Sequence, residues 1–383
     1  MATSGPRVMS TSRSASIRDH FADLTDLRRR KVVYPLINIV AIAICAVIAG
    51  ADDFVSIAVW ARQKRDWLSR ILDLSNGIPS HDRFNAVFAA LKPAEFEKCL
   101  VSWITALHEL TAGQVVAIDG KTLRHSFDTA TGKSAIHMVS AWATANHISL
   151  GQVVVDAKSN EITAIPKLLQ LLEISSSVVT IDAMGCQTAI AETIVDGGAD
   201  YVLAVKDNQP TLHAGIAAHF LDHMEDDFAR IKVSQHETTE RGHGRDEHRT
   251  YLVCDAPADL PDIARWKKLK RIGIAISETV RDGKPTDEVR YYILSRKMSA
   301  RSFGAAVRGH WGIENRLHWQ LDMTFGEDQC RIRKGNADAN FSILRRTALS
   351  LLKNETTAKV GMKNKRLTAA WNPDYLEKVL LGS

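Results

Sequence analysis

Apolar residues recur at helical spacing along the first quarter of the chain. Two sets lie three or four positions apart, which places each set on one face of a helix: Phe54, Ile57, Ala58 and Ala61, then Phe84, Val87, Phe88 and Leu91. Ser80 stands where the second helix needs an N-cap, and Lys92-Pro93 ends it. We therefore predict an all-α domain over residues 18–108. The Ser- and Thr-rich start at 1–17 is typical of a disordered segment rather than of a secretory signal.

Residues 34–50 carry no charge and follow the basic run 28–31, so this segment imitates a membrane anchor. Its 17 residues are at the short limit for crossing a hydrocarbon core of about 30 Å. Pro35 stands near its start, and Asp52 and Asp53 follow it closely. We expect a buried helix of a soluble protein here, with a membrane span as the alternative.

The pattern changes at Gly113 to short runs rich in β-branched residues. These runs predict strands at 114–118, 136–147, 151–155, 178–181 and 201–205. Helical spacing or helix-forming composition predicts helices between and after them, at 161–173, 187–196 and 209–224. β-like signals return from 231 to 295, and a long helix begins near Ser299. The order of elements predicts an α/β fold, a mixed sheet flanked by helices.

Two aspartates stand in the same local setting. Asp119 follows the apolar run Val-Val-Ala-Ile, and Asp182 follows Val-Val-Thr-Ile. Each should therefore lie at or just past the carboxyl end of a strand, where open α/β sheets gather their ligands. A carboxylate at the end of a buried strand is unfavourable unless it is paired or binds a cation. The alternative is that each aspartate caps a helix or a turn.

The predicted long helix carries a third acidic residue, Glu314, beside an apolar stripe formed by Ile313, Leu317 and Leu321. His310 lies one turn before Glu314 and His318 one turn after it. A surface helix with satisfied histidines is the alternative. Three carboxylates without a cysteine or histidine cluster suit Mg²⁺, and argue against zinc. Two metal ions roughly 4 Å apart, held by such a set, stabilise the attacking and leaving oxygens during displacement at phosphorus.

Composition adds two constraints. The five cysteines are scattered without a Cys-x-x-Cys pair, which argues against a disulfide framework and favours a reducing cytoplasm. Net charge is +5, but ten basic and two acidic side chains lie between residues 329 and 366. This excess predicts a phosphate-facing surface that continues into a basic C-terminal tail at 354–383, with a solvated helix face as the alternative.

Several ordered blocks of the chain resemble bacterial insertion-sequence transposases of the DDE type, in the H-repeat-associated branch. The likeness runs from about residue 20 to residue 353. The blocks that carry it are residues 36–51, Ala117–Arg124, Lys158–Pro166, Thr180–Gln187, Asp200–Gln209, Gly242-His-Gly-Arg245, His310–Trp319 and Phe325–Asp328.

The resemblance implies a function, a fold and a catalytic triad. It implies metal-dependent hydrolysis at transposon ends, followed by transfer of the freed 3′-hydroxyl into target DNA. Asp119, Asp182 and Glu314 match the catalytic residues of an RNase H-like domain at 109–353, which would hold two Mg²⁺ or Mn²⁺ ions. A β-rich insertion at about 228–297 interrupts it, and residues 18–108 match the associated N-terminal domain. Related transposases often carry Tyr, Arg and Lys where this chain has Val307, His310 and Leu321, which leaves the DNA grip of those positions open.

The same resemblance implies double-stranded DNA as partner, a homodimer that pairs both element ends, and a cytoplasmic, nucleoid-associated location. Candidate DNA contacts are the polar residues near the three carboxylates: Lys121, Arg124, Lys206, Asn208, His310, Asn315 and His318. For Lys121 and Arg124 a solvated surface position is the alternative. For the whole chain the alternatives are a DNA-binding transposase relic without catalysis and an RNase H-like nuclease without strand transfer.

Overall fold

The computed structural model describes residues 16–29, 32–107, 114–127, 132, 134–155, 160–242, 244–281 and 283–382. Apart from its last two positions, the expected disordered start at 1–17 lies outside the described residues. The predicted boundary between residues 108 and 109, the pair Lys158-Ser159 and the histidine of Gly242-His-Gly-Arg245 also lie outside them.

Before the first strand, helices are the only regular secondary structure among the described residues. They are α1 (Ile17–His20), α2 (Leu36–Ile48), α3 (Phe54–Gln63), α4 (Arg65–Leu68), α5 (His81–Ala90) and α6 (Pro93–Leu107). Ser80 caps α5 as predicted, because its Oγ accepts a hydrogen bond from the Arg83 N–H at 3.3 Å. Helix α2 is buried from Asn38 to Ile48, which confirms the buried helix. Within the described residues, no helix combines the length and the hydropathy that crossing a bilayer requires.

A single mixed sheet organises the rest of the chain, with the strand order β3-β2-β1-β4-β5-β9-β8-β7-β6. Its strands are β1 (Val115–Leu123), β2 (Ile136–Ala143), β3 (Ile148–Val155), β4 (Val178–Ile181), β5 (Asp200–Val205), β6 (Val233–Gly242), β7 (Arg245–Asp255), β8 (Arg271–Arg281) and β9 (Lys284–Leu294). β1 pairs antiparallel with β2 and parallel with β4, and β4 pairs parallel with β5. β9 joins β5 antiparallel. The later strands β6–β9, called the outer strands below, therefore extend the first sheet.

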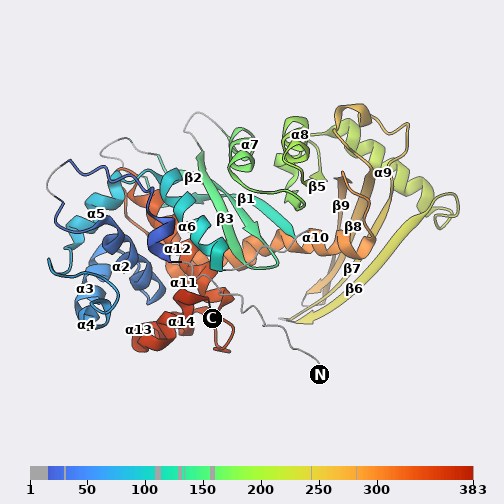
Figure 1. Cartoon of the computed structure of the whole chain (residues 1–383). Coiled ribbons are helices and arrows are strands. Elements are labelled where there is room, and N and C mark those ends of the chain that lie inside the picture. The colour runs from blue at the N-terminus through green and yellow to red at the C-terminus, as the bar shows by residue number, and fades with distance from the viewer. Residues whose placement is uncertain are drawn as a thin grey trace, which may run out of the picture.

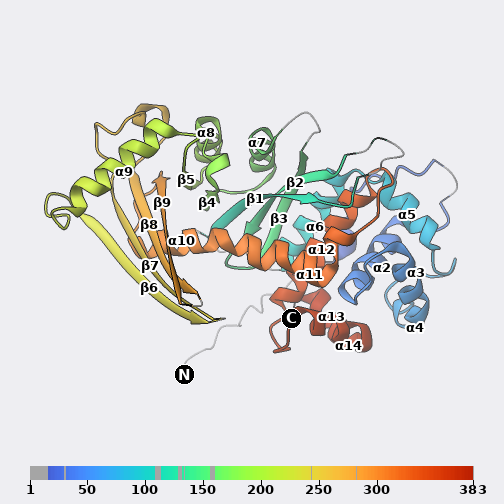
Figure 2. The ribbon, with the colours of Figure 1, turned by 180° about the vertical axis from the view of Figure 1, so that it is seen from behind.

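Helices cover both faces of this sheet. α7 (Glu161–Leu171) packs on β2 and β3, and α8 (Thr188–Asp196) packs on β5, on one face. α10 (Ala300–Gly312) crosses the other face beneath β1, β4 and β5 and continues to the outer strands (Figure 1 and Figure 2). α9 (Pro210–Met224) packs against β9. Short 3₁₀ turns, η1 (Ala183–Gly185), η2 (Ile263–Arg265) and η4 (Glu327–Gln329), connect larger elements.

The predicted long helix is present but changes its winding at the candidate site. α10 is followed without a break by η3 (Ile313–His318), which is π-helical, and by α11 (Trp319–Phe325). Ile313, Leu317 and Leu321 are fully buried, which confirms the predicted apolar stripe. A π-turn widens the helix by one residue and is often found at functional sites. Here it contains Glu314.

Helix α12 (Ala337–Asn354) joins the N-terminal helices to the sheet. It packs against α2, α5, α6 and β3, and the Phe341 ring contacts the Phe54 ring edge-on at 5.3 Å between centroids. The buried apolar side chains of both regions form one continuous cluster. The N-terminal helices and the sheet are therefore parts of one core rather than two separate ones.

The basic segment at 329–366 is partly buried, so the predicted phosphate-facing surface is wrong for four of its ten cations. Arg345, Arg346, Lys365 and Arg366 are each at most 8% exposed. Arg366 donates to the Val47 carbonyl at the end of α2, and Lys365 donates to the Leu352 carbonyl near the end of α12. The reason is that the last carbonyls of a helix lack partners within the helix, and these cations satisfy them. Instead of a free tail, the chain ends in α13 (Met362–Trp371) and α14 (Pro373–Leu381).

Candidate active site

Strand register places Asp119 and Asp182 next to each other. The last parallel pair between β1 and β4 is Ile118 with Ile181, and each aspartate is the next residue along the chain. Asp182 lies just past the end of β4, as predicted, whereas Asp119 lies inside β1, which continues to Leu123 through its pairing with β2. The Asp182 side chain also caps the η1 turn, since it accepts a hydrogen bond from the Gly185 N–H at 3.3 Å. The capping alternative therefore holds for Asp182 together with its place at the site.

Glu314 reaches the same place from η3, which packs on the face of the sheet toward which the Asp119 side chain points. One cavity of about 170 Å³ is lined by Asp119, Asp182 and Glu314 together, with side chains of β5, β9 and α10 completing its wall. The three carboxylates lie 63 and 132 residues apart along the chain, and three separate elements carry them. The tertiary structure therefore brings the three acidic residues to the wall of one cavity.

The three carboxylates give this cavity an excess of negative charge. Burial raises the pKa of Asp119 to about 7, and the charges of Asp182, Glu314 and Glu161 act in the same direction, against a hydrogen bond from the Gly120 N–H. Burial also raises the pKa of Glu314, where Asp182 adds to the effect and Arg290 opposes it. A bound cation would relieve this repulsion.

Two imidazoles lie against the carboxylates. His318 Nδ1 is 3.4 Å from Asp119 Oδ2, and His310 Nδ1 is 3.3 Å from the Thr180 hydroxyl on β4. Burial lowers the pKa of His310, and it lowers the pKa of His318 to about 3, with Arg346 and Lys121 contributing. Both rings are therefore neutral at physiological pH and do not neutralise the carboxylates.

Lys121 has a different place from the predicted DNA contact. Its side chain is 9% exposed, and its Nζ pairs with Asp322 and with Glu327 Oε2 at 3.0 Å. Lys121 follows Asp119 by two positions, so both side chains leave the same face of β1, toward η3 and α11. There the ammonium meets the partly exposed carboxylate of Asp322 and the buried carboxylate of Glu327. Lys121 is therefore neither a phosphate contact nor a solvated surface residue.

The other predicted contacts divide between the surface and the scaffold. Lys206 is exposed and lines the carboxylate cavity. Arg124 keeps 78% of its side chain exposed while pairing with Asp328 at 3.4 Å. Asn315 is exposed on η3 and lines a neighbouring cavity. Asn208 instead donates to the Ala183 carbonyl at 2.7 Å and so holds the turn that follows Asp182.

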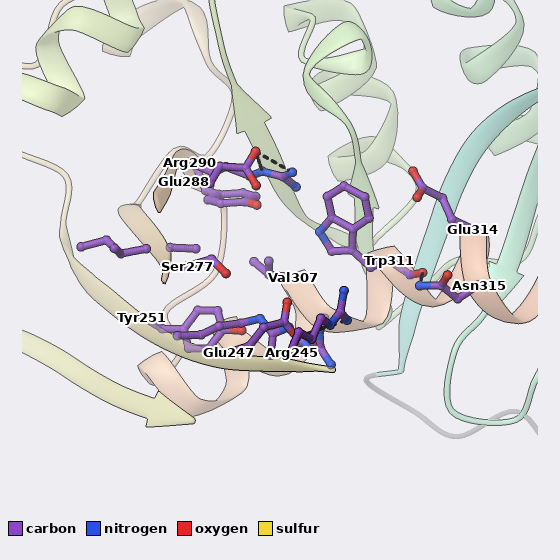
Figure 3. Close-up of a pocket in the computed structure, with 15 residues that line it drawn as sticks. Arg245, Glu247, Tyr251, Ser277, Glu288, Arg290, Val307, Trp311, Glu314 and Asn315 are labelled. Atoms are coloured by element: carbon purple, nitrogen blue, oxygen red, sulfur yellow. Dashed lines mark hydrogen bonds and ion pairs between the residues drawn. The ribbon is translucent and has the colours of Figure 1, made fainter. Parts of the chain in front are cut away.

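Sequence reasoning missed Arg290 on β9. This residue lines the carboxylate cavity and also a larger cavity of about 330 Å³ beside it (Figure 3). Its guanidinium lies 4.2 Å from the centre of the Trp311 ring and pairs with Glu288 at 2.7 Å. Only the pairing of β9 with β5 brings Arg290 to the site, so no local signal in the sequence could have identified it.

Glu161 is a second residue that sequence reasoning missed. A Cβ at Gly120 would lie 2.1 Å from Glu161 Oε1, so the glycine after Asp119 makes room for this carboxylate. Glu161 pairs with His137 Nε2 at 2.6 Å, and His137 Nδ1 bonds the Thr122 hydroxyl at 2.8 Å. The Asp-Gly pair at 119–120 was the only available signal of a close neighbour.

The donor set suits a hard divalent cation by its chemistry. The cavity offers carboxylate oxygens and no thiolate, which fits Mg²⁺ or Mn²⁺. Across the described ranges, no group of three acidic, histidine or cysteine side chains is already close enough to hold a metal ion. The carboxylates therefore share a cavity without forming a closed set of ligands.

Comparison with known families gives two adjoining matches. Residues 111–351 match a model described as the transposase DDE domain, and residues 18–104 match one described as DDE_Tnp_1-associated. Together they cover both the N-terminal helices and the sheet with its site.

Individual relatives are similar over nearly the whole chain. "H repeat-associated putative transposase YhhI" of Escherichia coli K12 is 41% identical over 377 residues, which cover 96% of this chain and 98% of the relative. "Putative transposase YncI" of Escherichia coli O157:H7 is 42% identical over 370 residues, covering 95% and 94%. A protein of Xanthobacter autotrophicus, "Uncharacterized protein in dhlA 3'region", is 39% identical over 266 residues, covering 69% and 88%.

Proposed function

The chain belongs to the family of proteins with a transposase DDE domain, and we propose that it is a catalytically competent transposase. It hydrolyses one strand at each end of its element and transfers the freed 3′-hydroxyl into target DNA. The observation that carries this proposal is the single cavity lined by Asp119, Asp182 and Glu314. The raised pKa of Asp119, to which Asp182 and Glu314 contribute, supports the same grouping.

Asp119, Asp182 and Glu314 would hold the divalent cations of the reaction. Two such cations, when bound, lower the barrier by stabilising the charge on the attacking and leaving oxygens. The chain itself supplies the rigid frame. Asn208 holds the turn after Asp182, and His318 lies against Asp119. These two contacts limit how far the Asp182 and Asp119 carboxylates can move.

The order of the inner strands supports an RNase H-like catalytic core. β3, β2 and β1 are antiparallel neighbours, and β4 and β5 continue from β1 in parallel. The β-rich segment between Asp182 and Glu314 is then the insertion proposed for about 228–297, and residues 18–108 are the associated helical domain. We propose double-stranded DNA as the substrate, bound by a dimer that pairs the two ends.

Lys206, Arg124, Asn315 and His310 are the proposed DNA contacts near the cut. Lys206 offers an exposed ammonium on the cavity rim, where a phosphate would meet it. Arg124 and Asn315 are both exposed. His310 is neutral and faces the cavity, so it would position a phosphate or terminal nucleotide through a hydrogen bond rather than through charge.

The deciding experiment is an assay of cleavage and joining. DNA that carries the inverted repeats found beside the gene is incubated with the protein and with Mg²⁺ or Mn²⁺. We expect nicked ends and joined products, and neither in EDTA. Nicks without joined products would instead identify a nuclease without strand transfer. DNA binding without any metal-dependent nick would identify a transposase relic.

A further inference from the structure

A groove of about 410 Å³, called the side groove below, lies between the continuous helix of α10 and η3 and the end of β2. A Cβ at Gly309 would lie 3.4 Å from the Thr144 hydroxyl oxygen, so the helix and the end of β2 are in contact there. Residues of both parts line the side groove, among them Trp142 and Thr144 from β2 and the residue after it, and Arg308, Gly309, Asn315 and Arg316 from the helix.

The side groove and the carboxylate cavity lie on different sides of one helical turn. Glu314 lines the carboxylate cavity, and Arg316, two positions later on η3, lines the side groove. Two positions are about half a turn, so these two side chains leave nearly opposite sides of the helix. Trp311 lines both cavities, and Asn315 stands beside Glu314 on the same stretch of helix (Figure 3). The side groove is therefore about one helix diameter, roughly 10–12 Å, from the carboxylates.

Two cations at the side groove, called the cation pair below, have no carboxylate partner. Arg316 is exposed in its wall. Lys353, in the last turn of α12, is partly buried, and its Nζ lies 5.5 Å from the centre of the Trp142 ring, which lines the groove. Within the part of the chain that the structure describes, neither cation forms an ion pair. Arg308, at the other end of the groove, differs because it pairs with Glu240 at 2.9 Å.

The positive charge of the cation pair acts on its neighbours. Burial lowers the pKa of Lys353 to about 8, and the charges of Arg316 and Lys365 act in the same direction. Burial also lowers the pKa of His147, which stacks on the Trp142 ring, to about 4, with Lys353 and Arg316 contributing. Positive charge that is partly withdrawn from water without a counter-ion is unfavourable. An anion in the side groove would remove this cost.

We propose that the side groove binds DNA phosphates close to the reacting one, through Arg316 and Lys353. The inference rests on the proposed function and names where part of its substrate lies. Successive phosphates of one strand advance by about 3.4 Å along the duplex. A separation of roughly 10–12 Å across the helix therefore predicts contacts about three to four base pairs from the reacting phosphate. Two DNA duplexes offer this chemistry, the element end and the target.

The test is the salt dependence of DNA binding, measured with Ca²⁺ in place of Mg²⁺ so that the DNA stays intact. One arm uses the inverted-repeat duplex, and the other adds a target duplex to protein already bound to a pre-cut end. The double variant Arg316→Gln, Lys353→Gln is expected to reduce the slope of log K against log salt by about two in at least one arm, and that arm identifies the duplex in the groove. Arg316→Gln alone, at an exposed position that should not affect folding, is expected to reduce it by about one.

The matched control is the double variant Arg301→Gln, Lys363→Gln. It removes the same net charge from exposed positions of α10 and α13, and neither residue lines the side groove. Both slopes should stay nearly unchanged. Arg316→Lys with Lys353→Arg keeps both cations and should retain the wild-type slopes.

Phosphate-ethylation interference supplies the second measurement. Ethylation about three to four base pairs from the reacting phosphate should block wild-type binding, and the double variant of the cation pair should lose that interference. Unchanged slopes in both arms, an unchanged interference pattern, or an equal effect of the control variant would overturn the inference. If the wild-type protein binds DNA through the cation pair but never nicks it, the proposed function fails while the inference stands. If the double variant nicks and joins DNA with both slopes unaltered, the inference fails while the proposed function stands.

Discussion

Asp119 shows what the grouping of carboxylates means for a single residue. It is the most perturbed member of the triad, since burial and three neighbouring carboxylates raise its pKa to about 7. A raised carboxyl pKa makes the folded state bind protons more tightly than the unfolded chain. Asp119 therefore lowers the stability of the metal-free protein at neutral pH, as residues at functional sites often do.

Asp119→Asn is expected to abolish cleavage while stabilising the metal-free fold. Loss of a metal ligand removes several kcal/mol of transition-state stabilisation, so activity should fall at least ~100-fold. In EDTA above pH 7, the free energy of unfolding should rise by on the order of 1–3 kcal/mol, because the variant neither buries a charge nor repels the neighbouring carboxylates. The gain should shrink as pH falls from about 7 toward 3.8, where wild-type Asp119 becomes protonated in the folded protein.

Thermal melts across this pH range and the cleavage assay measure both effects. Asp287→Asn is the matched control, since Asp287 is exposed on the other face of β9, and it should change neither. Wild-type cleavage by Asp119→Asn would remove Asp119 from the catalytic set. Lower stability of this variant above pH 7 would contradict the assigned repulsion.

Glu327 is the opposite case, a buried carboxylate that stabilises the fold. It is 1% exposed and accepts from Arg346 at 3.1 Å and from Lys121 at 3.0 Å. Although burial raises its pKa, the charges of Arg346 and Lys121 hold the pKa at about 2, below the ordinary 4.5. Its stabilising effect is therefore complete above pH 4.5 and is lost as pH falls toward 2.

Glu327→Gln should lower the free energy of unfolding by about 3 kcal/mol at neutral pH, because buried Arg346 loses its carboxylate partner and Lys121 loses one of its carboxylate partners. The difference from wild type should narrow as pH falls below about 4.5. Urea titrations at several pH values would measure it. Asp328→Asn, at a less buried carboxylate beside it, should have a much smaller effect. An equal effect of both changes would argue against the buried pairing.

At the scale of elements, the continuous helix formed by α10, η3 and α11 connects the candidate site with the outer strands. Gly304 lets α10 approach β7, because a Cβ there would lie 2.8 Å from the Tyr251 ring. Gly312, one residue before the π-turn, has no such neighbour: the nearest atom is Arg316 Cδ at 3.9 Å. The two glycines therefore differ in their effect. Gly304 permits close packing of α10 on β7, whereas Gly312 only weakens the helix.

Alanine at these two glycines should change stability in opposite directions. Gly304→Ala is expected to destabilise the protein by about 1–3 kcal/mol, since the buried Tyr251 ring must shift. Gly312→Ala should stabilise it by up to ~1 kcal/mol, because alanine favours the helical backbone. Chemical denaturation of both variants provides the measurement. The same sign for both would contradict the packing of α10 on the outer strands.

For the whole molecule, α12 makes the N-terminal helices and the sheet one structure. Asn340 on α12 donates to the Phe88 and Leu91 carbonyls of the α5 end, and Arg366 pairs with Asp52. These contacts bury polar groups that would lack partners if the N-terminal helices were removed. Removal of the N-terminal helices would also expose the apolar side chains of α12 and β3 that pack against them, which would lower the stability further.

A chain that begins at residue 114 should therefore fail to fold on its own. We expect aggregation or a loss of near-ultraviolet circular dichroism, whereas the full chain should unfold in one cooperative transition. Differential scanning calorimetry of both chains is the measurement. A chain that begins at residue 16 is the control. A cooperative transition of the shorter sheet fragment would mean that the two regions are independent domains.

The sequence by itself determined the local structure and the family. Local signals placed the buried helix α2, the capped helix α5 and the two strands at which Asp119 and Asp182 lie: an uncharged stretch, helical spacing with an N-cap, and β-branched runs, respectively. They succeed because backbone preference and amphipathic spacing act over a few residues. The ordered blocks from residue 36 to residue 328 indicated a transposase of the DDE type, and the family comparison agrees. The apolar stripe of Ile313, Leu317 and Leu321 was equally readable, since burial follows helical spacing.

Only the tertiary structure decided which charged groups meet. Lys121, Arg345, Arg346, Lys365 and Arg366 look like surface cations in the sequence, yet the fold buries them against carboxylates and helix ends. The sheet brings Arg290 to the candidate site and aligns Arg245 with Arg281 and Lys284. A charge is stabilised by partners that lie far away in the chain, and local sequence carries no information about the register and packing that bring those partners together.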